Sequence, residues 1–419
     1  MCDYKIRYLA YKCPHPDYGP GKDEEKTFCI FHNDREDKDL EKFYKGFEKL
    51  YKSGKHDFRG FIFPVRFDFN KLKEETGDLE FKEAGFVRAI FSEKADFSGA
   101  TFSGGANFWG ATFSGGAYFV GATFSGEAYF VVATFLGEAY FVGATFLEKS
   151  KVIFQGKTFE DGATAHFINL KIEKDADLTF DGINLNRARF IGTDLENINF
   201  KEISWQKSGR LVKRNMLYDE TFQLGPFESL SIKLKKLLKK EGEFFREKGN
   251  HYEVKRLYNL LRINYEKTGR YHEAGDFFVG AMEMRMKGTR EGILTKFILF
   301  LYKLISLYGE RPIRAFLLLF ILPFFFSSFY LLSGLNSSGK EVNYDLVFSL
   351  RNFGSTFWND FLQALKYSLS VMTLRRFETN GIIPTDSTFF ISIFELIFGA
   401  TLLSLFVLAM NRKFRRTKN

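Results

Sequence analysis

Phenylalanine recurs between residues 97 and 146 at steps that alternate between five and six residues. The positions are Phe97, Phe102, Phe108, Phe113, Phe119, Phe124, Phe130, Phe135, Phe141 and Phe146. An alanine stands two residues before each of them, from Ala95 to Ala144. A helix face repeats every 3.6 residues and a half-buried strand every two, so neither produces this pattern. The period fits a four-sided coil in which each side turns one large and one small side chain inward.

Sides of five, six, five and six residues make one full coil, so the pattern returns to its starting side at every fourth phenylalanine. Two stacked columns are then expected: Phe102, Phe124 and Phe146, and Phe97, Phe119 and Phe141. The extra residue of alternate sides is usually glycine, which indicates a relaxed corner. These glycines are Gly105, Gly110, Gly116, Gly121 and Gly143. After a less regular stretch the five-residue register resumes from Phe190 to Trp205.

The repeated A-(D/N)-F-x-x unit resembles the pentapeptide-repeat family over residues 58–205. The resemblance implies a right-handed quadrilateral β-helix, in which each coil contacts only its neighbours. In some members of the family an acidic rod mimics DNA and inhibits a topoisomerase. Residues 95–147 carry only Asp96, Glu127 and Glu138 as acids, which argues against such mimicry. A nearly neutral rod favours a spacer or a surface for self-association.

The last hundred residues contain two apolar runs, 315–335 and 389–410. Each is long enough to cross a hydrocarbon core of about 30 Å as a helix, which needs roughly 20 residues. Basic residues flank the runs on one side: Arg311, Arg314, Arg412, Lys413, Arg415 and Arg416. We therefore expect a multi-pass protein of the plasma (inner) membrane, with both termini cytoplasmic and residues 336–388 outside. The segment Met1–Leu40 is polar and charged, which predicts no signal peptide.

Residues 356–377, between the two runs, read as an amphipathic half-helix followed by a loop. With Pro384 after the loop, an acid early in the second run and a glycine in its middle, this region resembles the bacterial two-transmembrane, potassium-channel-like pore domain. The resemblance implies a homotetramer with a re-entrant pore helix in each subunit. It implies that Glu395 supports the pore helix and that Gly399 is a gating hinge. The alternatives are a neutral core acid at Glu395 and close helix packing at Gly399.

The region departs from that family at the selectivity filter. A potassium filter needs T-x-G-Y/F-G, because glycines let successive carbonyls point at the ion. The sequence has no glycine between Gly354 and Gly381. The predicted filter residues are instead Thr373, Leu374, Arg375, Arg376, Phe377 and Glu378. Arginine rings favour anions, whereas the negative end of the half-helix favours cations. Anion conduction, non-selective or cation conduction, and a non-conducting sensor all remain open.

All three cysteines lie in the first thirty residues, and Cys29 and His32 form a C-x-x-H motif. Because cytosolic chains rarely keep disulfides, clustered cysteines and histidines predict metal ligands. Cys2, Cys13, Cys29 and His32 would close a structural zinc site, with no position left open for catalysis. His15 is a rival ligand. The alternative is three reduced cysteines near a mobile terminus.

Helical patterns occupy the remaining segments. Residues 34–55 predict a short amphipathic helix, and 231–240 a basic amphipathic one. Residues 251–268 and 271–286 predict an antiparallel helical hairpin. Residues 293–308 are apolar but contain two lysines, so we expect an amphipathic helix in the membrane interface.

The predicted fold class is a multidomain membrane protein in which a β-helix and an α-helical linker precede a two-helix pore domain. Its predicted domains are an N-terminal segment 1–57, the β-helix 58–205, a cytosolic helical linker 206–292, an interfacial helix 293–312 and the pore domain 313–419. Within the pore domain, the first span covers about 313–335, the pore helix and loop about 356–380, and the second span about 387–411. These elements predict a tetrameric ion channel that is not potassium-selective and is gated by its cytosolic part.

A membrane-anchored scaffold or sensor that does not conduct is the alternative function. The expected partners are the lipid membrane, three further copies of the chain and permeant ions. The net charge of +9 is modest for 419 residues, and the basic runs adjoin apolar stretches, so no nucleic acid is expected. We expect no enzyme, because the six histidines are scattered and no nucleophile motif or phosphate loop is present.

Overall fold

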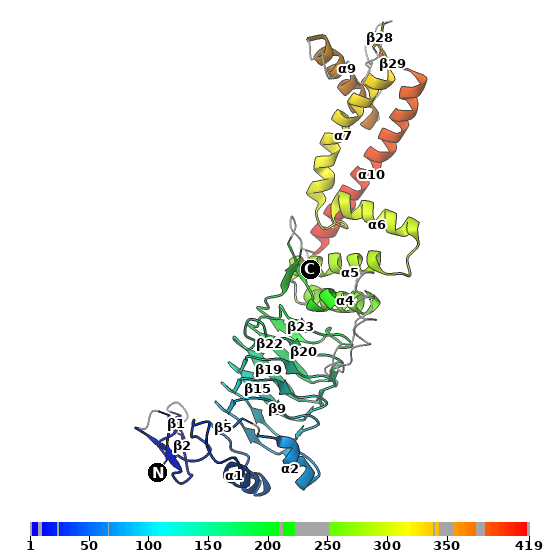
Figure 1. Ribbon diagram of the computed structural model, residues 1–419. Helices are drawn as coiled ribbons and strands as arrows, with labels where there is room; N and C mark the ends of the chain where they lie inside the picture. The colour runs from blue at the N-terminus through cyan, green and yellow to red at the C-terminus, as the bar shows by residue number, and fades with distance from the viewer. Residues whose placement is uncertain are drawn as a thin grey trace, which may run out of the picture. The chain divides into compact units, whose positions relative to one another are not determined.

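The computed structural model describes residues 2–6, 11–22, 25–65, 67–208, 213–222, 251–337, 340–342, 355–373 and 382–416. The chain forms two compact units, a solenoid unit, Met1–Lys287, and a helical unit, Gly288–Asn419. Figure 1 shows stacked strands in the first unit and long helices in the second.

Short parallel strands stack in four sheets, and each coil adds one strand to each sheet in turn (Figure 1). The first sheet contains β6 (Glu80–Phe81), β10 (Thr101–Phe102), β14 (Thr123–Phe124), β18 (Thr145–Phe146) and β21 (Lys171–Ile172). The second contains β7 (Ala84–Gly85), β11 (Ala106–Asn107), β15 (Glu127–Val131), β19 (Lys151–Gln155), β22 (Asp177–Asp181) and β24 (Asn199–Lys201). The third contains β5 (Ile62–Phe63), β8 (Ile90–Phe91), β12 (Thr112–Phe113) and β16 (Thr134–Phe135). The fourth contains β9 (Ala95–Asp96), β13 (Ala117–Tyr118), β17 (Ala139–Tyr140), β20 (Ala165–His166) and β23 (Ala188–Arg189). The resulting β-solenoid has about six turns.

Stacked phenylalanine rings fill the solenoid. The register pairs Phe102 with Phe124, and Phe124 with Phe146, so the coil length expected from the sequence is confirmed here. Ring centroids in this column are 4.9 and 5.5 Å apart. In the other predicted column they are 5.1 Å apart between Phe97 and Phe119, and 4.8 Å between Phe119 and Phe141. The other two sides have columns of their own: Phe86, Phe108, Phe130 and Phe154, and Phe63, Phe91, Phe113 and Phe135. Buried alanines pack beside the rings.

The corner glycines have two different roles. Gly110, Gly121 and Gly143 adopt φ of 64°, 63° and 65°, as expected for relaxed corners. Gly105 and Gly116, predicted for the same role, have no positive φ. The residue just before each of them needs glycine instead, because a Cβ at Gly104 or Gly115 would overlap the backbone of the preceding coil; the same holds at Gly126 and Gly137.

Two helices and two small hairpins precede the regular coils. The hairpins are β1 (Lys5–Ile6) with β2 (Tyr11–Lys12), and β3 (Gly19–Pro20) with β4 (Thr27–Phe28). The helix predicted over 34–55 is α1 (Leu40–Lys52), whose N-cap Asp39 accepts a hydrogen bond from the backbone of Lys42. Phe47 on α1 packs 4.7 Å from Phe58. In α2 (Phe69–Thr76), Phe69 packs 4.6 Å from Phe97. These elements cover the first coils.

A helical hairpin covers the last coil. It comprises α4 (His251–Lys267) and α5 (Tyr271–Lys287), preceded by β25 (Gln206–Ser208), β26 (Arg214–Met216) and the 3-10 helix η2 (Tyr218–Phe222). The indole N–H of Trp205 donates to the hydroxyl of Tyr265 at 2.8 Å. The amide of Asn264 donates to the carbonyls of Leu195 and Ile198 at 3.0 and 2.7 Å. The predicted hairpin therefore belongs to the solenoid unit. The basic segment 231–240 lies outside the described residues.

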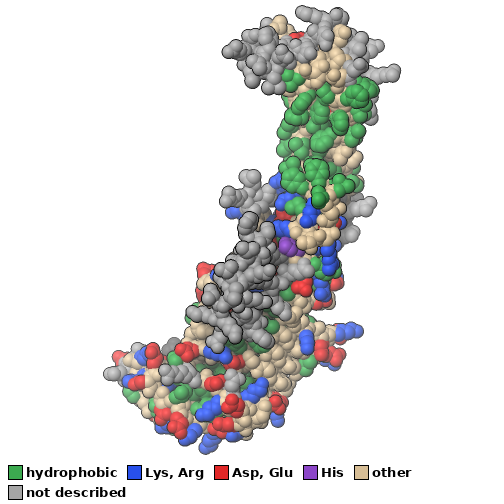
Figure 2. Space-filling model, turned by 45° about the vertical axis from the view of Figure 1, so that its right-hand side comes forward, with side chains coloured by type: hydrophobic (Ala, Val, Ile, Leu, Met, Phe, Trp, Pro, Cys, Tyr) green, Lys and Arg blue, Asp and Glu red, His purple; other side chains and the backbone are tan. Residues whose placement is uncertain are grey.

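The helical unit contains α6 (Ile293–Ser306), α7 (Pro312–Ser333), α9 (Ser355–Met372) and α10 (Asp386–Arg416), with short strands β27 (Leu335–Ser337), β28 (Lys340–Val342) and β29 (Ile382–Pro384). Two helical segments, Pro312–Ser333 and Ser387–Asn411, are long and apolar enough to cross a membrane. Figure 2 shows apolar side chains over much of the face of this unit that is in view. On α6, Ile293, Leu294, Phe297 and Ile298 are all exposed.

Candidate functional site

A buried carboxyl group joins three helices of the helical unit. Glu395 on α10 is 0% exposed. It accepts one hydrogen bond from the hydroxyl of Tyr330 on α7 and another from the hydroxyl of Ser368 on α9. The ring of Tyr330 also packs 5.1 Å from that of Tyr367 on α9. An acid among apolar helices is costly, and hydrogen bonds to both carboxyl oxygens offset part of that cost.

The polar partners of Glu395 follow from helix geometry. Residues three and four apart share a helix face, and Ala364, Tyr367 and Ser368 are all buried on α9. Ala364 is small, so α9 approaches α7 closely, and Leu331 and Leu335 complete the apolar cluster around Tyr330. Sequence reasoning identified Glu395 but not Ser368. The single tyrosine in an otherwise apolar run was the signal that could have identified Tyr330.

Gly399 lies one helical turn beyond Glu395, where the end of α9 meets α10. A Cβ at Gly399 would lie 3.3 Å from the terminal methyl of Met372. Helix α10 continues without interruption through this position. The contact supplies a packing reason for glycine, and the predicted hinge stays a prediction.

Of the predicted filter residues, the structure describes Thr373 alone. Its hydroxyl donates to the carbonyl of Leu369 at 2.8 Å, which closes the last turn of α9. Leu374, Arg375, Arg376, Phe377 and Glu378 lie outside the described residues.

The short strands that precede and follow α9 in the sequence belong to one sheet. Strand β27 pairs with β28 before α9 and with β29 after it. The hydroxyl of Thr388 on α10 donates to the carbonyl of Gly334, just after α7, at 2.6 Å. Thr385 donates to the same carbonyl at 3.0 Å. These bonds hold the C-terminus of α7 against the N-terminus of α10.

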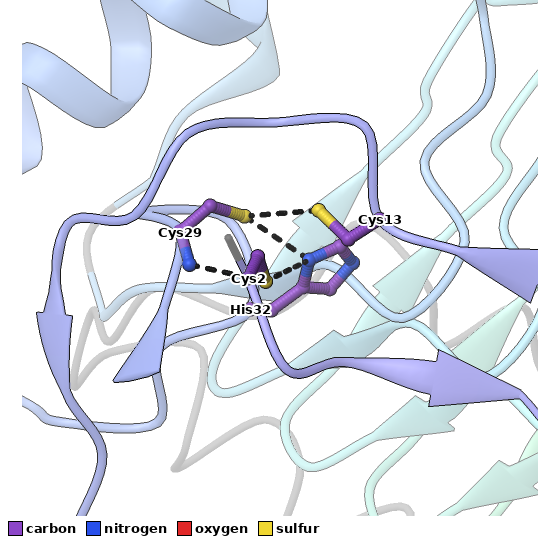
Figure 3. Close-up of side chains that lie close together, drawn as sticks. All are labelled: Cys2, Cys13, Cys29 and His32. Carbon is purple, nitrogen blue, oxygen red and sulfur yellow. Dashed lines mark hydrogen bonds between the residues drawn. The ribbon is translucent and has the colours of Figure 1, made fainter. Parts of the chain in front are cut away.

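The second candidate site is the cluster of Cys2, Cys13, Cys29 and His32 in the solenoid unit (Figure 3). All four residues are buried, and their ligand atoms lie within 4.8 Å of one another. The Cys13 and Cys29 Sγ atoms are 3.6 Å apart. The Nδ1 of His32 lies 3.1 Å from the Sγ of Cys29 and 3.7 Å from that of Cys2. The structure thus brings together all four predicted ligands, and such a cluster could hold a metal ion.

The two hairpins explain how distant cysteines meet. Cys2 precedes β1 and Cys13 follows β2, so pairing of these strands brings the two residues side by side. Cys29 follows β4, and the backbone N–H of His32 donates to its carbonyl at 3.1 Å in a tight turn. The Cys2–Cys13 gap, unusual for a zinc finger, is therefore the span of a β-hairpin. The rival His15 packs its ring 4.9 Å from Phe31 and is not among the clustered ligands.

Without a bound ion, the surroundings of Cys13 favour its neutral thiol. The hydrogen bond with Cys29, and then burial, raises the pKa of the Cys13 thiol to about 12. Metal ligation requires the thiolate, so a bound cation would have to stabilise the negative charge that burial disfavours.

A family model described as pentapeptide repeats (9 copies) matches residues 80–123 and 108–148. This match and the stacked parallel strands together support a pentapeptide-repeat β-solenoid. The matched residues do not extend into the helical unit. No curated protein and no solved structure matches the chain.

Proposed function

We propose that the chain is the subunit of a tetrameric membrane ion channel that its solenoid unit gates. The observation that carries the proposal is the buried Glu395, which holds α9 against α7 and α10 through Ser368 and Tyr330. We call the contact of Glu395 with Ser368 and Tyr330 the bracket. Such a polar contact is expected where a helix, here the 18-residue α9, must keep a fixed position among membrane spans. The resemblance to two-transmembrane channels implies the same role for this carboxyl group, the support of the pore helix.

The surface of α7 and α10 supports insertion in a membrane. Both helices have large apolar side chains that are exposed, among them Phe320, Ile321, Phe394 and Ile397. In water this surface would drive aggregation, whereas lipid and neighbouring subunits can cover it. A two-helix hairpin cannot enclose a pore by itself, so the proposal requires several copies.

A re-entrant path for α9 is supported by its connections. The pairing of β27 with both β28 and β29 holds the two ends of the connecting segment together. The last residue of α9, Met372, packs against Gly399, thirteen residues after the start of α10. At 1.5 Å per residue, this point lies about 20 Å along α10, deep in a bilayer. Strand β29 follows α9 in the sequence and pairs with β27, as we would expect if the residues between α9 and β29 formed the loop of a pore.

The proposed pore is not potassium-selective, because the segment after Met372 lacks the glycines of a carbonyl filter. We assign the mouth to Arg375 and Arg376, whose positive charge favours anions. The proposal has both termini in the cytoplasm. It has α6 at the inner surface of the membrane, with its exposed apolar side chains in contact with lipid. Motion of the solenoid unit would then reach the pore through α6.

Planar-bilayer recording of purified full-length tetramers tests the proposal. In a potassium chloride gradient, we expect the current to reverse at a potential shifted from zero toward the chloride equilibrium potential. The double variant Arg375→Ala, Arg376→Ala should move the reversal potential toward that of potassium. Intact tetramers that pass no current under any ion gradient would instead support the membrane-anchored scaffold. Reversal at the potassium potential in the unmodified protein would refute the assigned mouth.

A matched pair of serine variants tests the bracket separately. Ser368→Ala leaves one Glu395 oxygen without its donor, which costs about 1–3 kcal/mol. Ser328→Ala on α7 removes an exposed hydroxyl bonded only to its own helix. Hydrogen exchange in α9 should accelerate in the first variant and not in the second. Equal exchange in both would contradict the role given to Glu395.

A further inference from the structure

The ligand atoms of the cysteine and histidine cluster already have nearly the spacing of a tetrahedral zinc site. With Zn–S bonds of about 2.3 Å and a Zn–N bond of about 2.0 Å, tetrahedral neighbours lie roughly 3.8 Å (S to S) and 3.5 Å (S to N) apart. The separations are 3.6 Å for Cys13–Cys29, 3.7 Å for Cys2–His32 and 3.1 Å for Cys29–His32. The longest ligand separation is within 4.8 Å, so closing on an ion requires a contraction of about 1 Å.

The four ligand atoms favour zinc over magnesium and calcium. Three thiolates and one imidazole are soft and borderline ligands, which disfavour magnesium and calcium. Four protein ligands complete a tetrahedral shell and leave no position for water or substrate, as in structural zinc sites.

The groups around the four ligands also match a metal site. The Nε2 of His32 lies 2.8 Å from the carbonyl oxygen of Arg59, which fixes the ring so that Nδ1 faces the sulfurs. Ligand histidines in metal sites are commonly held through the other ring nitrogen in this way. The backbone N–H of Cys29 donates to the Sγ of Cys2 at 3.2 Å, and that of His15 to the Sγ of Cys13 at 3.4 Å. These donors would offset the negative charge of the thiolates.

The segment that carries the ligands has little secondary structure of its own. Each of its four strands is two residues long. Segments shorter than about 40 residues usually need a metal, disulfides or a partner surface to fold. This segment has such a surface, because Phe31 stacks 4.4 Å from Phe61 and its carbonyl accepts from the backbone of Ile62 at 2.8 Å.

We propose that Cys2, Cys13, Cys29 and His32 bind one zinc ion, and that this ion folds residues 2–33 into a cap over the first coil of the solenoid. The carbonyl of Arg59 connects the ion to the start of the first coil. Solenoids require capping elements because their terminal coils expose apolar ends. Loss of the ion would uncover Phe61, which is 0% exposed in the folded cap and packs against the rings of Phe31 and His32.

Metal analysis of the full-length protein purified in detergent tests the proposal. We expect one zinc per chain in the unmodified protein and less than about a tenth of that in Cys29→Ser. His15→Phe keeps the aromatic packing and serves as the control, with its zinc content unchanged. Cobalt exchanged into the protein should show the visible bands of a tetrahedral thiolate site. Hydrogen exchange in residues 29–33 and 58–63 should rise at least tenfold when a chelator removes the metal.

Several results would overturn the inference. The zinc assignment is wrong if the unmodified protein contains iron or no stoichiometric metal, or if its mass shows an intramolecular disulfide. His15→Phe losing zinc as completely as Cys29→Ser would overturn the ligand set. If Cys29→Ser fails to fold, His32→Cys decides, since a four-cysteine site should still bind one zinc. Metal removal that leaves exchange at 58–63 unchanged would refute the capping role.

Discussion

Replacing Asn264 by leucine should release the helical hairpin from the end of the solenoid. Asn264 lies on α4 and is 5% exposed. Its two amide hydrogens serve three carbonyls, those of Leu195 at 3.0 Å, Glu196 at 3.0 Å and Ile198 at 2.7 Å. Leucine has a similar size but donates nothing. The variant therefore keeps the packing volume and removes the hydrogen bonds.

The expected cost follows from the number of bonds. Two hydrogen bonds contribute about 1 kcal/mol each, and buried carbonyls left without a donor add about 1–3 kcal/mol. Because the bonds to Leu195 and Ile198 are buried, we expect a total of about 3–5 kcal/mol. At 1.36 kcal/mol for each factor of ten, this corresponds to roughly 150- to 5,000-fold faster opening of α4.

Amide hydrogen exchange of the full-length protein, followed peptide by peptide, measures this opening. The control is Lys267→Ala on the same helix, which removes an exposed ion pair with Glu196 of 2.6 Å. Exposed pairs contribute about 0–1 kcal/mol, so the control should change exchange by less than about fivefold. Equal acceleration in the two variants would refute the reasoning. Acceleration in coils 97–146 as large as that in α4 would also refute it, since solenoid coils depend mainly on their neighbours.

Three further predictions concern the solenoid. Phe119→Ala should destabilise its coils by about 3–5 kcal/mol, because the ring is fully buried between two others; exchange in 97–141 checks this, and an effect no larger than that of Tyr129→Ala on the outer face would contradict it. Val132→Gly should stabilise its corner by about 1 kcal/mol, because valine there holds a left-handed φ of 47°. Gly121→Val, at an equivalent corner with nothing within 4 Å of a new Cβ, should destabilise its corner. If hydrogen exchange changed in the same direction in both variants, the argument would be refuted. Burial, and then the charge of Arg189, lowers the pKa of His166 to about 4. The stability that is present above pH 6.5 should therefore fall by up to about 3 kcal/mol as the pH drops toward 4. His166→Gln should lack this loss, and parallel pH profiles of hydrogen exchange in the two proteins would contradict the prediction.

The coil length and the two ring columns were predictable from the sequence because a solenoid repeats one local rule. Each inward position must hold a side chain that stacks on its copy in the next coil, so the spacing of phenylalanine records the geometry. The rule weakens after Phe146, where the next partner in its sheet is Ile172. The coil from Phe146 to Ile172 is longer than the one from Phe124 to Phe146, and it contains the extended strand β19. A longer coil changes the spacing without breaking the stack, and periodicity alone cannot place the extra residues.

The contacts that end the solenoid were not predictable in the same way. Asn264 lies on the apolar face of its helix with Leu257, Leu261 and Tyr265. A polar residue at such a position predicts a buried hydrogen-bond partner, but it does not indicate which residue that partner is. The carbonyls that Asn264 binds belong to residues 66 to 69 positions earlier in the chain. Likewise, the metal ligands could be identified by residue type, whereas the hairpin that brings Cys2 to Cys13 consists of strands too short to recognise.

The coils 97–118 and 119–140 share the same pattern of inward alanine and phenylalanine, so the length of the rod is a modular quantity. Removing 119–140 would join Tyr118 to Phe141, a junction chemically the same as the existing one between Tyr118 and Phe119. Every later strand would still meet a partner of the same kind, and the stack would shorten by one strand spacing, about 4.8 Å. Duplication of the same segment would lengthen it equally. In-frame gain or loss of one repeat could thus adjust the reach of this protein in fixed steps, while both end caps keep their own contacts.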